Sequence, residues 1–290
     1  MPKHQRFNKI AILGLGLMGG SIAASLKRLG TCQRISAYDV NQEALKEAFN
    51  KKLIDSFHDT VSQTIEDVDL IIISTPVDQY PLLFTQIAAI LTHNQILTDV
   101  GSTKSLIVKQ AQEILREKIH QFVPAHPIAG SHKSGVGALD PTLFEKAQII
   151  LTPLAKLTRK EAIEEVTIFW QNLNANVTLL DPNEHDAIFA LTSHLPQALS
   201  YAFLSTCFDE SASSDFYPYT GGGFRDIARI GASDLQMWRS IFLSNKTNVV
   251  QAIEKFSEHL VLFKQAILDH NPTKLEEMIR KANQIAASFN

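Results

Sequence analysis

Cysteine is scarce in this sequence, with only Cys32 and Cys207 among 290 residues. Two cysteines outside any CxxC pair cannot build a disulfide framework, and we expect both to be buried thiols in a reducing compartment. Glycine and proline are also few, at 13 and 11 residues, which excludes a collagen-like or low-complexity chain. The 27 Lys and Arg residues do not outnumber the 30 Asp and Glu residues. The chain therefore lacks the positive field that holds nucleic acid, and we expect small-molecule ligands.

Long apolar runs are limited to two stretches. Lys9 and the apolar residues up to Met18 imitate a signal peptide, but the glycines in and beside that run weaken a signal helix. The stretch Ala187–Phe208 contains no Asp, Glu, Lys or Arg and is long enough to span a bilayer. It carries polar residues such as Ser193 and His194, so we expect a buried helix at a domain or subunit contact. We expect a cytoplasmic protein with no membrane partner.

The first 180 residues alternate short β-branched segments with segments of helical period. The predicted strands are Lys9–Leu13, Arg34–Tyr38, Asp69–Ser74, Gln95–Asp99, Gln121–Ala125, Gln148–Thr152 and Asn176–Leu180. The predicted helices between them are Asn41–Lys51, Tyr80–Leu91, Lys104–Glu117 and Arg159–Leu173. This alternation indicates parallel βαβ units in a doubly wound sheet.

After Asp181-Pro182 the pattern becomes helical throughout. The predicted helices are Asp186–Phe208, Asp234–Leu268 and Thr273–Ala287. We predict an α/β domain of residues 1–181 followed by an all-helical domain of residues 182–290.

A GxGxxG motif stands directly after the first strand and opens a helix. Gly14 permits the tight turn, Gly16 lets the backbone approach a pyrophosphate, and Gly19 lets helix and strand pack closely. Asp39 ends the second strand 20 residues after Gly19, where a carboxylate accepts hydrogen bonds from ribose hydroxyls. The alternative is a glycine turn beside an unrelated acid. The candidate cofactor-binding residues are Gly14, Leu15, Gly16, Leu17, Met18, Gly19, Asp39, Ser74, Thr75 and Ser102.

The carboxylate of Asp39 also distinguishes between nicotinamide cofactors. NADP carries a phosphate on the ribose 2′-oxygen, and that charge would face the carboxylate at close range. Val40 and Asn41 supply no positive charge to offset it. We therefore predict a Rossmann-type site for NAD.

Two loops, residues 98–104 and 124–135, follow predicted strand ends, where ligands of open α/β sheets bind. In the second loop, His126 precedes Pro127 on a short turn. Histidine suits the removal of a hydroxyl proton while hydride leaves the same carbon. On its own, His126 is equally consistent with a structural turn histidine.

Two arginines follow a glycine turn in the helical part. Arg225 and Arg229 are four residues apart, so a helix would place both on one face, where they could bind a small dicarboxylate. The alternative is a solvated basic face beside Asp226 and Asp234. The ten histidines form no HExxH pattern or Cys/His cluster, so we expect no metal site.

Several specific blocks occur in a fixed order along the chain. They are Gly14–Ser21, Asp99–Lys104, His126–Gly130 with Lys133–Gly135, Ser193–Pro196 and Gly221–Asp226, accompanied by Arg229 and Met237-Trp238. With these blocks the sequence resembles the prephenate/arogenate dehydrogenases of tyrosine biosynthesis, from residue 9 to about residue 265.

The resemblance implies a Rossmann domain followed by a helical dimerisation domain, and hence a homodimer. It implies NAD-dependent oxidative decarboxylation of prephenate to 4-hydroxyphenylpyruvate, or of arogenate to tyrosine. His126 would polarise the ring hydroxyl, Ser102 would bind the same region beside the nicotinamide, and Arg229 would bind a substrate carboxylate. Trp238 is expected to pack around the site. The substrate-binding residues carried over are Arg229, Ser193, Gln197, Gly222 and His132.

The sequence departs from the family pattern at two positions. His132 stands where the family commonly has an acidic residue, and Gln197 stands where a histidine often follows Ser-His-Leu-Pro. Glutamine cannot carry charge, so the preference between a keto-acid and an amino-acid side chain could change. We expect neither a C-terminal regulatory domain nor a chorismate mutase segment before Lys9. We therefore expect any tyrosine inhibition to act at the active site.

Two alternative functions stay open. A 3-hydroxyacid dehydrogenase or an imine reductase shares the Rossmann-plus-helical plan but lacks the block His126–Gly130. A catalytically silent NAD sensor that signals through its helical half would bind cofactor without turnover and would not need Arg229.

Overall fold

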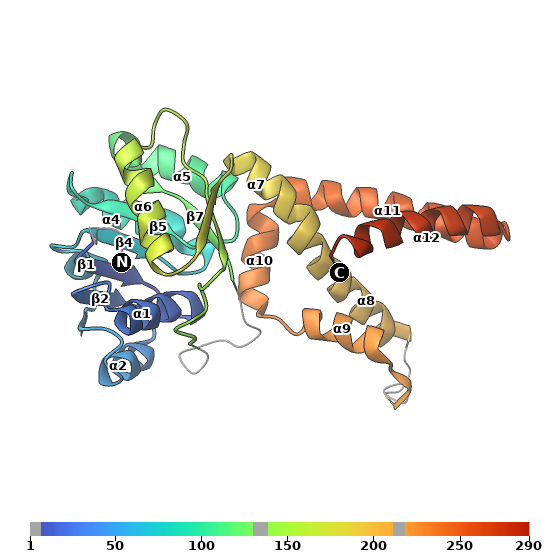
Figure 1. Ribbon diagram of the computed structural model, residues 1–290, viewed down its shortest axis with the longest axis horizontal. Helices are drawn as coiled ribbons and strands as arrows, with labels where there is room; N and C mark the ends of the chain where they lie inside the picture. The colour runs from blue at the N-terminus through green and yellow to red at the C-terminus, as the bar shows by residue number, and fades with distance from the viewer. Residues whose placement is uncertain (1–6, 130–138, 211–217, 290) are drawn as a thin grey trace.

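The amino-terminal half of the chain forms a parallel sheet with helices on both faces (Figure 1). This computed structural model describes residues 7–129, 139–210 and 218–289. The six strands lie in the order β3-β2-β1-β4-β5-β6, the order of a doubly wound dinucleotide-binding sheet. They are β1 Lys9–Leu13, β2 Arg34–Tyr38, β3 Ser56–Phe57, β4 Leu70–Ile73, β5 Ile96–Asp99 and β6 Phe122–Val123.

Two apolar cores, one on each face, hold the sheet between its helices. Along β1, Ile10 and Ile12 belong to the core that includes Ile22 of α1, whereas Ala11 and Leu13 belong to the core on the other face. This alternation is the two-residue period of a strand that is buried on both sides. The surrounding helices are α1 Leu17–Leu29, α2 Gln42–Asn50, α3 Val61–Thr64, α4 Tyr80–Ile90 and α5 Ser105–Leu115, with 3-10 turns η1 Val77–Gln79 and η2 Arg116–Gln121. The predicted helices in this region are confirmed, whereas the two-residue strand β3 was too short to predict.

The prediction of a single sheet is wrong for the last two predicted strands, Gln148–Thr152 and Asn176–Leu180, and for the end of the one before them. The segment predicted as one strand, Gln121–Ala125, divides at Pro124 between β6 and the start of a second sheet. Proline has no N–H for the ladder, and Pro127 is tolerated because its strand lies at the edge of the second sheet. That sheet contains β7 Ala125–Ile128, antiparallel to β8 Gln148–Leu151, with β9 Asn176–Leu179 parallel to β8 and α6 Lys160–Asn172 connecting β8 to β9.

The rest of the described chain is helical, as predicted. The helices are α7 Pro182–Phe189, the π-helical turn η4 Ala190–His194, α8 Leu195–Glu210, α9 Gly222–Gly231, α10 Leu235–Ser244, α11 Lys246–Leu268 and α12 Pro272–Ala287. The helix predicted over Asp186–Phe208 is thus interrupted by a π-turn. The helix predicted over Asp234–Leu268 breaks at Asn245, whose side-chain amide donates to the carbonyl of Asp186 at 2.7 Å. The domain boundary expected between residues 181 and 182 falls at the start of α7 and stays a prediction.

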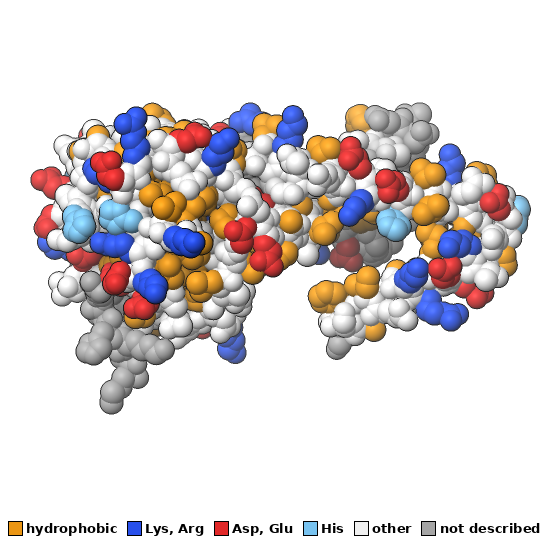
Figure 2. Space-filling view, turned by 90° about the horizontal axis from the view of Figure 1, so that it is seen from above, with side chains coloured by type: hydrophobic (Ala, Val, Ile, Leu, Met, Phe, Trp, Pro, Cys, Tyr) orange, Lys and Arg blue, Asp and Glu red, His pale blue; other side chains and the backbone are white. Residues whose placement is uncertain are grey.

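A long hairpin of α11 and α12 extends away from the α/β half (Figure 1). It carries apolar side chains on its surface, some of which Figure 2 shows. The exposed apolar side chains of the hairpin include Leu260, Val261, Leu262, Ile267, Leu268, Ile279 and Ile285. Within the described ranges, no helix is both long and apolar enough to cross a membrane.

Both cysteines form no disulfide and are only partly buried, so the expectation of buried thiols is wrong. Burial nevertheless raises the pKa of Cys32 to about 11. Its thiol therefore stays protonated at neutral pH and is a poor nucleophile.

Candidate active site

The glycine turn between β1 and α1 has the close contacts that its motif requires. Gly14 has a φ of +103°, and a Cβ there would lie 2.8 Å from the carbonyl of Ser74. A Cβ on Gly19 would lie 2.0 Å from the carbonyl oxygen of Gly14. A Cβ on Gly16 would meet nothing within 4 Å. The turn is thus tight at its base and open at its tip, where the first N–H groups of α1, including those of Leu17 and Met18, lack intrahelical partners.

Asp39 and Ser74 tie the neighbouring strand ends to this turn. The carboxylate of Asp39 accepts from the N–H of Leu15 at 2.6 Å and from the N–H of Asn41 at 2.8 Å. Each oxygen keeps a further lone pair for a ribose hydroxyl. The hydroxyl of Ser74 donates to the carbonyl of Gly14 at 2.7 Å, and Thr75 follows it at the carboxyl end of β4.

A buried ion pair, which the sequence reasoning missed, joins the next strand ends. The ammonium of Lys104 lies 2.5 Å from the carboxylate of Asp99 and also donates to the carbonyl of Ala125 at 2.7 Å, and both side chains are fully buried. Asp99 accepts as well from the N–H groups of Gly101 and Ala125 and from the hydroxyl of Tyr80. Burial lowers the pKa of Lys104 despite this carboxylate. The loop of Ser102 and the strand of the catalytic candidate are therefore bound to one carboxylate.

His126 lies on β7 and is 8% exposed. Its Nδ1 is 2.8 Å from Nε2 of His185, whose own Nδ1 is 2.9 Å from a carboxylate oxygen of Asp186. Burial, followed by the charges of His185, Lys104 and His194, holds the pKa of His126 well below its ordinary value. The imidazole is therefore neutral at neutral pH and can accept a proton. The sequence reasoning missed His185 and Asp186, although an adjacent His-Asp pair at the start of a helix was visible.

The predicted residues of η4 and α8 lie close together but differ in surroundings. Ser193 is half-buried in the π-turn, and Gln197 is buried with its amide donating to the carbonyl of Ile230 at 2.9 Å. Gln197 thus ties α8 to the end of α9. His194 is buried against Asn245, and the ring of Trp238 packs on it at 6.1 Å between centroids. Trp238, expected to pack around the site, thus packs on a buried histidine.

The remaining substrate-binding candidates lie on α9 or outside the described residues. Gly222 opens α9, which packs on α8. Arg229 is on the same helix with its side chain about half exposed, 3.9 Å from the carboxylate of Asp226. Among the described residues, the main packing partner of α9 is α8. His132 falls in residues 130–138, outside the described part.

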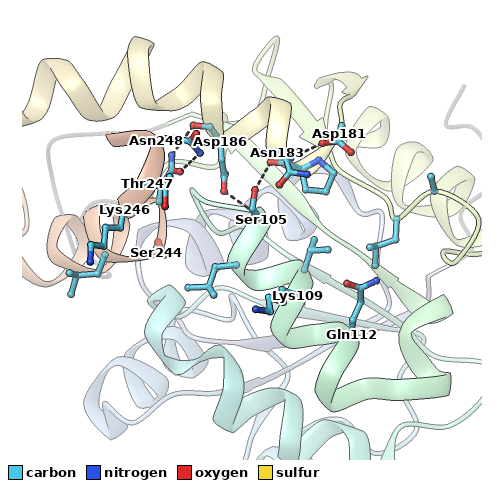
Figure 3. A pocket seen from close by; sticks show the side chains of 17 residues that line it. Ser105, Lys109, Gln112, Asp181, Asn183, Asp186, Ser244, Lys246, Thr247 and Asn248 are labelled. Carbon is cyan, nitrogen blue, oxygen red and sulfur yellow. Dashed lines mark hydrogen bonds between the residues drawn. The ribbon is translucent and has the colours of Figure 1, made fainter. Parts of the chain in front are cut away.

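A cavity of about 730 Å³ lies at the junction of α5, α7, α10 and α11 (Figure 3). It includes Asp186 but neither His126 nor the glycine turn. Its labelled polar lining includes Ser105, Lys109, Asn183, Lys246 and Asn248. Across residues 7–129, 139–210 and 218–289, no group of three or more His, Cys, Asp or Glu side chains could hold a metal ion.

Two family models match consecutive parts of the chain. The model for the prephenate dehydrogenase nucleotide-binding domain matches residues 22–179, and the model for the prephenate dehydrogenase dimerization domain matches residues 181–281. Together these matches cover most of the parallel-sheet half, from residue 22 onward, and most of the helical half.

Individual relatives agree with the family models. The chain is 36% identical over 258 residues to a prephenate dehydrogenase of Bacillus subtilis, covering 87% of this chain and 68% of that protein. It is 29% identical over 280 residues to a cyclohexadienyl dehydrogenase of Zymomonas mobilis, covering 96% and 94%. Its structure is similar to that of a prephenate dehydrogenase from Aquifex aeolicus in complex with hydroxyphenyl propionate and NAD+, with a TM-score of 0.91, 35% identity and 98% of both chains covered. The chain belongs to the prephenate dehydrogenase family.

Proposed function

We propose that this protein catalyses the NAD-dependent oxidative decarboxylation of prephenate to 4-hydroxyphenylpyruvate, or of arogenate to tyrosine. The main support for the proposal is the buried, neutral imidazole of His126 on β7. It occurs in a chain that belongs to the prephenate dehydrogenase family. A neutral imidazole can take the hydroxyl proton of the substrate while a hydride leaves the same carbon.

The residues around the glycine turn suit NAD. The open tip at Gly16 leaves room for a pyrophosphate, and the start of α1 presents N–H groups to its charge. The carboxylate of Asp39 would bind the adenosine ribose, with Ser74 and Thr75 at the neighbouring strand end. When bound, the nicotinamide supplies the hydride acceptor. The protein's residues would hold the substrate beside the nicotinamide and accept the proton of the substrate hydroxyl.

Replacing Asp39 with asparagine should relax the preference for NAD over NADP. Asparagine keeps an oxygen for the N–H of Leu15 but removes the charge that opposes a 2′-phosphate. We expect the ratio of kcat/KM for NAD to that for NADP to fall by about tenfold, which corresponds to roughly 1.4 kcal/mol. Glu43→Gln, an exposed charge change on the adjacent helix, is the control. A ratio unchanged in Asp39→Asn would mean that another group selects the cofactor.

In this proposal, His126 accepts the proton of the substrate hydroxyl, and Ser102 is a second hydrogen-bonding group at that hydroxyl. Ser102 follows the end of β5 and His126 lies on β7, and the carboxylate of Asp99 accepts from the N–H groups of the preceding residues Gly101 and Ala125. Ser193 and Gln197 would contact the rest of the substrate from the helical half, together with Gly222 and His132.

Arg229 would bind a substrate carboxylate through two parallel hydrogen bonds, which suit the planar guanidinium. Arg229→Ala should raise the KM for the substrate by about 10- to 100-fold, because hydrogen bonds to charged groups contribute about 1.5–3 kcal/mol. The KM for NAD should stay the same. Arg229→Lys keeps the charge without the fork and should lie between the two. Steady-state kinetics decides, with the exposed Arg239→Ala as control, and an unchanged substrate KM would remove this role.

The proposal includes a homodimer formed through the helical half. The α11–α12 hairpin exposes Leu260, Val261, Leu262, Ile267 and Leu268, an apolar surface of a kind that marks a protein contact. The matching dimerization-domain model supports the same partner. A second chain could also bring Arg229 to the site. Sedimentation should give twice the 32.2 kDa of one chain.

Steady-state kinetics with prephenate and arogenate, each with NAD and NADP, tests the function. We expect NADH and CO2 to appear together with at least one substrate, and added tyrosine to compete with it at the active site. NAD binding without turnover of either substrate would contradict the proposal and favour a sensor. Turnover of a 3-hydroxyacid or an imine instead would favour the other alternative.

A further inference from the structure

A histidine base must present the correct ring nitrogen. A neutral imidazole carries its proton on either Nδ1 or Nε2, and only the other nitrogen can accept a proton. Which form exists depends on the partner of each nitrogen. For His126 the structure supplies a partner for Nδ1, namely Nε2 of His185 at 2.8 Å.

The ionisation state of Asp186, which contacts the other nitrogen of His185, determines which histidine donates in this hydrogen bond. The two carboxylate oxygens of Asp186 accept from the backbone N–H groups of Lys104 and Ser105, each at 2.8 Å. Burial opposes its ionisation, but these bonds and the one from His185 lower the pKa of Asp186 below its ordinary value. An ionised carboxylate only accepts, so Nδ1 of His185 must donate to it at 2.9 Å.

The remaining protons then follow in sequence. Burial lowers the pKa of His185 although Asp186 opposes this, so its ring is neutral and its Nε2 carries a lone pair. That lone pair accepts from Nδ1 of His126. The Nε2 of His126 is left as the basic nitrogen. We propose that His185 and Asp186 are positioning residues that hold His126 in the Nδ1–H form, so that its Nε2 receives the substrate's hydroxyl proton.

His126, His185 and Asp186 form a hydrogen-bonded relay, and its surroundings disfavour a lasting positive charge on either imidazole. His185 and Asp186 are fully buried, and the ring of Phe189 packs on His126 at 4.8 Å and on His185 at 4.5 Å. The titratable groups facing this relay are Lys104, Asp99 and His194. The positive charge of Lys104 disfavours a permanently protonated imidazole, whereas the acceptor on His185 stabilises a transient one.

The inference rests on the proposed function, and the proton count of that reaction agrees with it. Hydride leaves the ring carbon with its electron pair for the nicotinamide of NAD+, and the hydroxyl proton moves to Nε2 of His126. When the carbon–carboxylate bond breaks, its electron pair enters the ring, CO2 departs, and the ring oxygen regains the proton from Nε2. No proton has to reach His185 or Asp186, so the buried relay needs no path to solvent.

The test replaces His185, because Asp186 also caps α5 and its loss could unfold the protein. His185→Leu fills the space but removes the acceptor for His126. His185→Gln keeps an oxygen that can accept from Nδ1. We expect kcat to fall by about 10²-fold in His185→Leu, and to recover to within about tenfold of the wild type in His185→Gln. The dissociation constant for NAD should be unchanged in both.

Nitrogen-15 NMR of the protein with labelled histidine measures which ring nitrogen of His126 carries the proton. His126→Asn identifies the signals of His126 by their disappearance. The wild type should show a protonated Nδ1 and a bare Nε2, and His185→Leu should show a mixture. His194→Leu, which removes a neighbouring buried histidine outside the relay, should keep the wild-type pattern.

The two proposals fail in different ways. A wild-type ring protonated on Nε2, or an unchanged ring and an unchanged kcat in His185→Leu, would overturn the relay. Absence of turnover by the wild type, with the Nδ1–H form intact, would overturn the proposed reaction while leaving the relay in place.

Discussion

His126→Asn should lower kcat by about 10²–10⁴-fold, the usual contribution of a positioned acid–base group, with little change in NAD affinity. The asparagine amide sits where Nδ1 was and can still donate to His185, so the buried contact at 2.8 Å has a replacement. It has no basic atom at the position of Nε2. The glycine turn and Asp39 lie on other strands and should bind the cofactor as before.

Turnover and NAD titration by fluorescence together measure this separation. His120→Asn serves as the control because that histidine lies on η2 and is only partly buried, with its ring against the carbonyl of Glu117 and the ring of His93. Equal losses of turnover and NAD affinity in His126→Asn would contradict a role in proton transfer and indicate a structural histidine.

Lys104→Met should lower the free energy of unfolding of the α/β half by about 3–5 kcal/mol, the usual result of breaking a buried ion pair. Methionine leaves the carboxylate of Asp99 in the core without its cation. The carbonyl of Ala125 loses its donor at the same time. Since Ala125 precedes His126, we also expect a loss of activity.

Urea denaturation followed by tryptophan fluorescence measures the effect. The chain has two tryptophans, and a Trp238→Phe background leaves Trp170, which is buried in the core of the α/β half. Adding Asp99→Asn to Lys104→Met should restore part of the loss by removing the stranded charge. Lys46→Met, which breaks the exposed pair with Glu43, should cost about 0–1 kcal/mol. A cost that small for Lys104→Met would mean that the buried pair does not stabilise the fold.

The features that could be predicted from sequence are those set by local pattern. The turn from Gly14 to Gly19, the alternating strands and most helices depend on neighbouring residues, and they appear where the pattern indicates. The second sheet could not be predicted in this way. A segment such as β8 has the same apolar run whether it joins a parallel sheet or pairs antiparallel with β7.

The relay behind His126 escaped prediction for a related reason. His126 and His185 are 59 residues apart, and Asp186 meets the backbone of Lys104 from 82 residues away. No spacing rule links such positions. They meet because the chain turns at Pro124 out of the parallel sheet and carries β7 against α7. Asp99 and Lys104 are only five residues apart in sequence, yet the burial of their ion pair depends on the same packing of β7 and α7.

The attachment of Asp186 to both halves has a consequence for how this enzyme could be divided or recombined. Its carboxylate binds the start of α5, and its carbonyl binds the side chain of Asn245 at the corner of α10 and α11. A nucleotide-binding half grafted onto a foreign helical partner would carry its dinucleotide turn intact. It would contain His126 but lack His185, which orients that imidazole. The foreign partner would therefore have to provide a group in place of α7 before the same reaction could occur.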